Sequence, residues 1–430
     1  MMKRTLLTLI AALCLSFAHA GEKPEFLIVP GSSLCPPPQV SPEAVTTAEN
    51  QLSTKKRQYQ QGLSDYLSVM DAEILVLKLK ISLLRADGEE KNLLLQQIRH
   101  ADAERMKLVE ARYRSGGISE LEYRTCVFRY IWERLSWEDT PENAALAVKA
   151  AEALEASVLE GLRCGQTDRI QCLIAAITCG EAKLRQNRNA ADIQQQSAEV
   201  QKLYDELAAL CAARAKHSLG ALVMEVEAAL AARCFEREYA CHVLRDADVV
   251  HRTHNAILKL LERLRDDFYF AAEREEVSQE EVHRVELRQA EEIVRGCRAE
   301  NSEKAAMIQR IIAMADYSFH EESIPSLAER LCYGTYETDK TTEGIVEYLK
   351  ITGDGCCGQR IFIQTSKGEF YLLEEDREDE TDSLMLYQSG SKEWITCSTD
   401  VPKSFAEDDT LSGLWIRLRQ WLQRSARSQR

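Results

Sequence analysis

Residues 250–268 read VHRTHNAILKLLERLRDDF, and this stretch decides the fold class of the chain. Its apolar side chains recur in alternating steps of four and three residues. They are Val250, Ile257, Leu261, Leu264 and Phe268, with His254 in the same series. Such steps place the side chains in one stripe of an α-helix, where they pack against the stripe of another helix. The stretch therefore predicts a long amphipathic helix with a helical neighbour.

The helical pattern extends over most of the chain. Residues 46–302 contain a single proline, Pro141, and the whole chain of 430 residues has only 19 glycines and 9 prolines. This scarcity favours helices. Residues 340–430 differ, because they hold short segments rich in Val, Ile, Tyr and Phe, with Ser366-Lys367-Gly368 as a hairpin turn between two of them. We expect strands at 344–351, 359–365, 369–373, 383–387 and 394–397, followed by a helix at 411–424.

Two kinds of break interrupt the helical region, and each recurs. The first is a tip, where a residue able to leave the helical conformation precedes a Ser or Thr that caps a new helix. Tips are expected at 59–64, 113–119, 163–167 and 275–278, with caps at Ser64, Ser119, Thr167 and Ser278. The spacing of the caps predicts one more, degenerate tip near residue 222, within Gly220-Ala221-Leu222-Val223.

The second kind of break falls midway between the tips. It occurs at 86–88, 139–141, 187–189, 246–248 and 300–302. The two series divide 46–302 into about five units of roughly 50–55 residues, each an antiparallel helical hairpin. Stacked hairpins bury the apolar stripes that a single hairpin leaves exposed. The chain is therefore expected to be mostly α, with tandem hairpins, connecting helices at 303–339 and a small α+β module at 340–430; an irregular helical bundle is the alternative.

The N-terminal residues predict export. Lys3 and Arg4 precede an apolar stretch and the small-residue site Ala18-His19-Ala20, so residues 1–20 are expected to be a cleavable signal peptide. Leu13 before Cys14 does not fit a lipoprotein. Residues 21–45 are rich in proline and predict an extended tether. Since no later stretch holds enough apolar residues for a membrane helix, a periplasmic or secreted protein is expected.

The cysteines predict disulfides in an exported protein. The chain has 14, and removal of Cys14 with the signal peptide leaves an odd number. A bridge between adjacent units is expected from Cys179 to Cys234, with small buried hydrophobic residues as the alternative. The adjacent Cys356 and Cys357 are expected to bond to different partners. Candidate partners are Cys332 and Cys397.

The segment Tyr113-Arg114-Ser115-Gly116-Gly117-Ile118-Ser119 resembles the hairpin tips of TolC-type outer-membrane efflux proteins. Tyr59, Gly62, Leu63, Ser64 and Leu67 match the same pattern, as do Val277, Ser278, Val282 and Leu287. Each match covers about twenty residues, and residues 46–302 lack the membrane strands of that family. The resemblance implies hairpin geometry, a periplasmic setting and tip contacts, but no transport tunnel. The implied contact residues are Tyr59, Gly62, Ser64, Tyr113, Gly116, Gly117, Ser119 and Ser278.

The C-terminal residues 411–430 combine arginines with an apolar stripe and contain no acidic residue. Trp415, Arg417, Arg419 and Trp421 are candidates for docking on an anionic membrane surface or on a partner. The alternative is a helix that packs on its own domain and leaves its arginines in solvent.

No pattern predicts catalysis. The chain lacks phosphate-binding, nucleophile-elbow and zinc-protease motifs, and no metal or cofactor is expected. His251 and His254 fit a core or interface better than a metal site, and the acidic run 374–382 fits a solvated loop better than a calcium site. A net charge of −15 argues against nucleic-acid binding.

The sequence therefore predicts a non-enzymatic exported scaffold of the bacterial cell envelope with a protein partner. An accessory component of an efflux or secretion system is one alternative, and an enzyme with a site in residues 340–430 is the other. The oligomeric state is left open.

Overall fold

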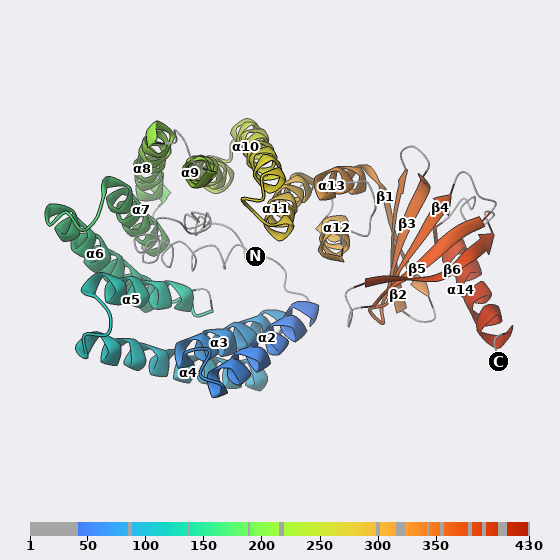
Figure 1. Ribbon diagram of the computed structural model, residues 1–430, viewed down its shortest axis with the longest axis horizontal. Helices are drawn as coiled ribbons and strands as arrows, with labels where there is room; N and C mark the ends of the chain where they lie inside the picture. Colours follow the sequence, from blue (N-terminus) through green and yellow to red (C-terminus); the bar gives the residue numbers. More distant parts are fainter. Residues whose placement is uncertain are drawn as a thin grey trace. The chain divides into compact units, whose positions relative to one another are not determined.

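The computed structural model describes most of the chain from residue 42 onward (Figure 1). The described residues are 42–84, 88–135, 137–187, 190–214, 219–297, 302–314, 323–341, 344–352, 357–376, 381–388, 393–402 and 411–428. The chain divides into two compact units, Met1–Leu260 and Leu261–Arg430. The signal peptide and nearly all of the proline-rich tether lie outside the described residues.

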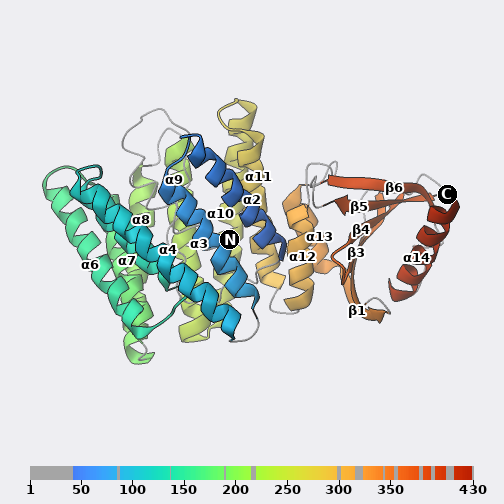
Figure 2. The same cartoon turned by 90° about the horizontal axis from the view of Figure 1, so that it is seen from below.

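The first unit is a series of helices in which each packs on the next along the chain. They are α2 (Pro42–Gln60), α3 (Tyr66–Leu83), α4 (Glu89–Arg114), α5 (Glu120–Arg134), α6 (Pro141–Arg163), α7 (Arg169–Gln186), α8 (Ala190–Arg214) and α9 (Leu219–Tyr239), which continues as the π-helical turn η1 (Ala240–Leu244). α10 (Ala247–Glu273) begins in this unit and ends in the second. Figure 2 shows α6, α7 and α8 side by side. The expected tandem antiparallel hairpins are confirmed, and they begin at residues 42, 89, 141, 190 and 247.

The hairpins are joined by shared apolar cores. One core combines Phe128 of α5 with side chains of α6 and α7, and another combines α7 with Tyr204 of α8 and Phe235 of α9. Because α7 contributes to both, side chains around most of its circumference are buried. The predicted stripe of α10 is also buried from Ile257 to Phe268.

Most breaks between hairpins fall where they are expected. Thr140 caps α6 by accepting a hydrogen bond from the Asn143 amide at 3.2 Å, and Pro141 is the first helical residue. Asp246 accepts from the amides of Asp248 and Val249 at the start of α10. Residues 86–87, 188–189 and 300–301 lie outside the described residues.

The tip expected at Gly220-Ala221-Leu222-Val223 is wrong, because these residues lie inside α9. The connection between α8 and α9 is 215–218, which lies outside the described residues. A glycine within a helix costs only about 1 kcal/mol relative to alanine. Gly220 is the second residue of α9, so the connection comes before this glycine rather than after it.

The second unit contains α11 (Gln279–Cys297), α12 (Ser302–Met314) and α13 (Ile324–Tyr333), then a sheet and α14 (Leu411–Ser428). The strands are β1 (Thr335–Thr341), β2 (Gly344–Thr352), β3 (Cys357–Thr365), β4 (Phe370–Asp376), β5 (Thr381–Gln388) and β6 (Glu393–Pro402). They form one antiparallel sheet in sequence order, which confirms the small α+β module. The sequence does not predict β1, TYETDKT, because this end strand is almost entirely polar.

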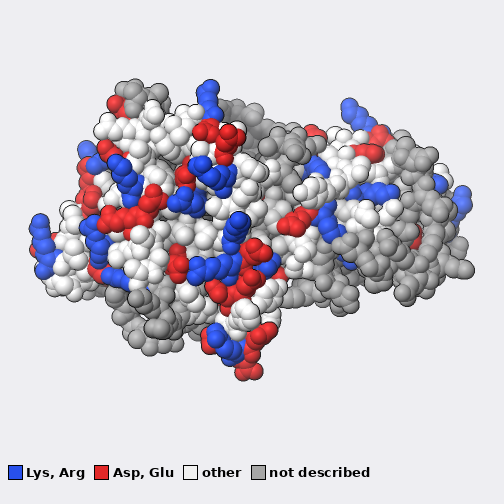
Figure 3. Space-filling view, turned by 90° about the horizontal axis from the view of Figure 1, so that it is seen from above, with Lys and Arg blue, Asp and Glu red and all other residues white. Residues whose placement is uncertain are grey.

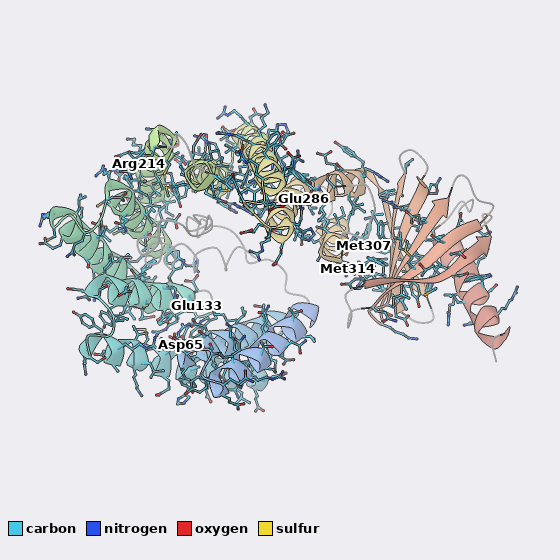
Figure 4. The ribbon with its side chains drawn as sticks, viewed as in Figure 1. Asp65, Glu133, Arg214, Glu286, Met307 and Met314 are labelled. Atoms are coloured by element: carbon cyan, nitrogen blue, oxygen red, sulfur yellow. The ribbon has the colours of Figure 1, made fainter. Side chains whose placement is uncertain are left out.

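Helices cover both faces of the sheet (Figure 1). Tyr348, Ile363 and Leu373 face α14 and form a buried cluster with its Leu414, Trp415 and Leu418. On the opposite face, Arg310 of α12 contacts Glu347 of β2 at 2.7 Å, and the Trp394 indole donates to the Met314 carbonyl at 3.3 Å. Figure 4 shows Met307 and Met314 on α12, beside the sheet. The pairing of β6 with β5 is irregular at two places, beside Leu384.

Candidate functional site

Four tips end in the same turn, and this turn is the most regular feature of the described residues. Gly62, Gly116, Gly165 and Glu275 have φ angles of 73°, 73°, 71° and 59°. At the second tip, the Gly116 amide donates to the Tyr113 carbonyl at 2.9 Å, and the Gly117 amide donates to the Arg112 carbonyl at 2.8 Å. The other three tips repeat this pair of bonds at equivalent positions. This is the Schellman motif, which satisfies the free carbonyls at a helix end.

A capping residue follows each of these turns at a constant distance of three positions. Ser119 and Ser278 are caps as expected, and each exchanges hydrogen bonds with the glutamate three residues later. The caps expected at Ser64 and Thr167 are wrong, because α3 and α7 are capped by Asp65 and Asp168. The Thr167 hydroxyl instead donates to the Val158 carbonyl at 2.7 Å and lies against Gly161.

The first tip exposes apolar side chains. Leu63 is 75% exposed, and Tyr59 and Tyr66 are each 46% exposed, with their ring centroids 5.4 Å apart. At the second tip, the rings of Tyr113 and Tyr123 stack at 4.5 Å between α4 and α5. The contact residues implied by the resemblance therefore lie at tips, although Ser64 is not a cap. Leu63 was not among them, and its position directly after Gly62 was the signal that could have identified it.

Ion pairs connect successive tips. Arg112, at the end of α4, lies 3.2 Å from Asp65, which caps α3 of the preceding hairpin. Arg214, at the end of α8, lies 2.7 Å from Asp168, which caps α7. Figure 4 shows Asp65 and Arg214. Partial burial raises the pKa of Asp65, but the hydrogen bonds from Ser68 and the charge of Arg112 together lower it below its usual range.

A second cluster of charged residues is buried between α3, α4 and α5. Its centre is Arg105, which is 1% exposed and contacts Asp102 at 2.7 Å and both Asp71 and Glu133 at 2.8 Å. Lys78 also pairs with Glu133, and Arg134 pairs with Asp102 at 2.5 Å. The Arg105 guanidinium carbon lies 3.7 Å from the ring centroid of Tyr130. We call these residues the Arg105 cluster, and Figure 4 labels Glu133 within it.

The electrostatics of the Arg105 cluster favour a structural role. Burial opposes ionisation of Glu133, but Lys78 and Arg105 lower its pKa to about 2. Burial lowers the pKa of Lys78 and raises that of Tyr130 to about 12. Each of the three acids is paired with at least one cation. The cluster therefore cross-links three helices rather than providing a general base.

The cysteines are mostly thiols in the described part of the chain. The expected bridge between Cys179 and Cys234 is wrong, because Cys179 is a free thiol. Cys179 belongs to the core shared by α5, α6 and α7, whereas Cys234 lies on α9 near Tyr204. Cys397 is also free and is exposed on β6. Cys332 is disulfide-bonded, while Cys356 and the side chain of Cys357 lie outside the described residues.

The C-terminal helix packs on its own domain. Trp415 is 3% exposed and lies 5.6 Å from the ring of Tyr371, and Trp421 packs against the same cluster. Arg417 and Arg419 are half-buried. The expected docking surface is therefore wrong for the two tryptophans, because the sheet already covers the apolar stripe.

The other candidates show no metal chemistry. His251 is exposed, and its ring nitrogen lies 3.1 Å from the Asn255 amide nitrogen. Within the part of the chain that the structure describes, no three His, Cys, Asp or Glu side chains are arranged to hold a metal ion. Residues 377–380 of the acidic run lie outside that part. Among the described helices, none has the length and apolarity needed to cross a bilayer.

Comparison with known family models, curated proteins and solved structures finds no match for this chain.

Proposed function

We propose that this protein is a non-enzymatic scaffold of the bacterial cell envelope, exported to the periplasm or beyond, that binds a protein partner through its helical hairpins. The observation that supports this proposal best is the repeated tip. Four tips share one turn, and the first of them holds Leu63 exposed beside Tyr59 and Tyr66. Apolar and aromatic side chains on a fixed turn suit protein binding, because they lose little conformational freedom when a partner covers them.

The arrangement of charges also fits a scaffold. On the face drawn in Figure 3, basic and acidic side chains are intermingled over the described residues and form no broad basic surface. The net charge of −15 agrees with a protein partner better than with nucleic acid. A catalytic site in residues 340–430 has less support, since α12, α13 and α14 cover the two faces of the described sheet.

An accessory role in an efflux or secretion system is the second candidate. The observation that favours it is the second tip, where Gly116 forms the turn and Ser119 forms a capping box with Glu122. This is the segment that resembles the tips of TolC-type proteins. The two candidates differ in the partner that they require, which is an outer-membrane channel only for the second.

Site-specific photo-cross-linking in the native envelope tests the proposal. A photoreactive residue replaces Leu63 in one variant and Leu93 in the control, because Leu93 is also an exposed leucine but lies near the start of α4, away from the tips. We expect a discrete cross-linked product from position 63 and none from position 93. An outer-membrane channel in that product would select the second candidate. Equal cross-linking at both positions, or none at either, would contradict binding through the tip.

A further inference from the structure

A carboxyl group lies buried in the interface between the third and fourth hairpins. Glu181 of α7 is 1% exposed. Its neighbours on the same face of the helix, Ile177 and Leu184, belong to the apolar core that α7 shares with α8 and α9. Aliphatic surroundings of this kind cannot solvate a charge, so an ionised carboxylate there is costly unless a cation or several donors surround it.

The hydrogen bonding of Glu181 does not meet that requirement. The Tyr204 hydroxyl of α8 donates to its Oε1 at 2.6 Å. The other oxygen, Oε2, is buried and has no hydrogen-bond partner among the described residues. One neutral donor is too little to hold a buried charge. Burial raises the pKa of Glu181 to about 8, although the hydrogen bond from Tyr204 acts in the opposite direction.

The charged groups around α7 are engaged elsewhere. The charged groups that α6 and α8 direct at α7 are Glu152, paired with Lys183; Glu155, beside Cys179; Glu206, paired with Arg169; and Arg214, paired with Asp168. From α9, the Cys234 thiol lies near Tyr204 rather than near Glu181. Tyr204 is therefore the one described titratable group that acts on the Glu181 carboxyl.

We propose that Glu181 is a pH-sensitive latch, whose proton holds α7 against α8 and whose release as the pH rises loosens the third hairpin from the fourth. The inference goes beyond the proposed scaffold function, because it assigns a regulatory device to the hairpin stack. The proton leaves when the interface opens and water reaches the carboxyl. Opening is thus favoured as the pH rises from the ordinary carboxyl range toward 8. Arg214 and Asp168 form an ion pair between the same two helices at their tips. Loosening α7 from α8 therefore also weakens the connection between the tips of the third and fourth hairpins.

Amide hydrogen exchange of the full chain tests the latch. The protection of α7 and α8 is compared at pH 5 and pH 8, after correction for the intrinsic exchange rates. The carboxyl has an ordinary pKa in the open state and a raised pKa in the closed state. The opening equilibrium is therefore expected to grow by roughly a few hundredfold over this range. Glu181→Gln keeps an acceptor for Tyr204 but cannot ionise, so its protection is expected to stay constant. Glu199→Gln, at an exposed position of α8, is the control and is expected to behave as the wild type.

Two further measurements test the latch even if Glu181→Gln folds poorly. Carbon NMR of the Glu181 carboxyl is expected to show titration near pH 8, and Tyr204→Phe is expected to move that titration to higher pH, because it removes the donor to the carboxylate. Titration at the ordinary value for glutamate would overturn the proposal. A parallel loss of protection in the wild type and in Glu181→Gln would do the same.

Discussion

Arg214 at the end of α8 lies 2.7 Å from Asp168, the residue that caps α7. The two side chains contribute differently to stability. Both are partly exposed, and exposed ion pairs contribute less than about 1 kcal/mol, so Arg214→Ala is expected to cost little. Asp168→Ala also removes the acceptor for the Gln171 amide, and a lost cap costs about 1–2 kcal/mol. Denaturant unfolding of the two variants measures the difference, and equal losses would contradict the capping role.

Arg105→Met is expected to be among the most damaging substitutions in the first unit. It leaves Asp71, Asp102 and Glu133 without their shared partner, and a buried charge without its partner costs about 3–5 kcal/mol. Arg114→Met is the control, since Arg114 is 75% exposed and pairs with Glu110 of its own helix. Thermal unfolding should separate the two variants clearly. If Arg105→Met lost as little stability as the control, the Arg105 cluster would not be a cross-link between the three helices.

The Arg105 cluster should also contribute to acid unfolding. The pKa of Glu133 is about 2 in the folded protein, below its usual value of 4.5. A lowered folded-state pKa gives stability that is complete above the unfolded-state value and is lost as the pH falls toward the folded-state value. The wild type should therefore lose stability between about pH 4.5 and pH 2. Glu133→Gln should be less stable at neutral pH and show a shallower acid dependence, measured by urea unfolding at a series of pH values. If Glu133→Gln showed the same dependence of stability on pH as the wild type, this result would contradict the lowered pKa of Glu133.

The geometry shared by the four turns predicts opposite effects on stability for substitutions at Glu275 and at Gly165. Glu275 adopts φ 59°, a conformation that costs a residue with a side chain about 1–2 kcal/mol, so Glu275→Gly is expected to stabilise the protein by about 1 kcal/mol. At Gly165, φ is 71° and the space around the missing Cβ is open. Gly165→Ala is therefore expected to destabilise through backbone strain alone, by a similar amount. Unfolding midpoints measure both changes, and a loss of stability in Glu275→Gly would contradict the shared geometry.

Thiol labelling of the native protein tests the placement of the cysteines. Cys164, Cys241 and Cys397 are exposed and should react quickly. Cys179 and Cys211 are buried, and burial raises the pKa of each to about 11, so both should stay unmodified until the protein unfolds. Mass mapping after a short pulse of alkylating reagent identifies the modified positions. Early modification of Cys179 would place it outside the core.

The sequence predicted the features that depend on local pattern. The stripe from Ile257 to Phe268 follows from helical periodicity, and Gly62 and Gly116 mark turns that favour glycine. The cap at Asp65 was missed because Ser64 and Asp65 are both good caps, and the turn geometry selects between them. β1 was missed because this end strand consists of polar residues and lacks the alternation of polar and apolar side chains that marks a half-buried strand.

The charged clusters were not predictable for a different reason. Arg105 meets Asp71 and Glu133, which lie 34 and 28 residues away on other helices. Glu181 is one acid among many in a helical region, and its burial depends on how α8 and α9 are placed. Features of this kind arise from the stacking of hairpins, which a single sequence does not specify.

The irregular ladder of β6 has a consequence for the solubility of the sheet. β1 and β6 end the sheet, and β1 carries Glu337, Asp339 and Lys340 at its margin. Glu393 and Asp400 of β6 are charged, but residues 394–399 between them are not, and an uncharged stretch of an end strand can pair with other chains and extend the sheet into fibres. The two irregularities near Leu384 interrupt the even spacing of the outer amides and carbonyls that such growth would require. We therefore expect the irregular pairing to protect the β6 margin from polymerisation, and the charged side chains to protect the margin at β1.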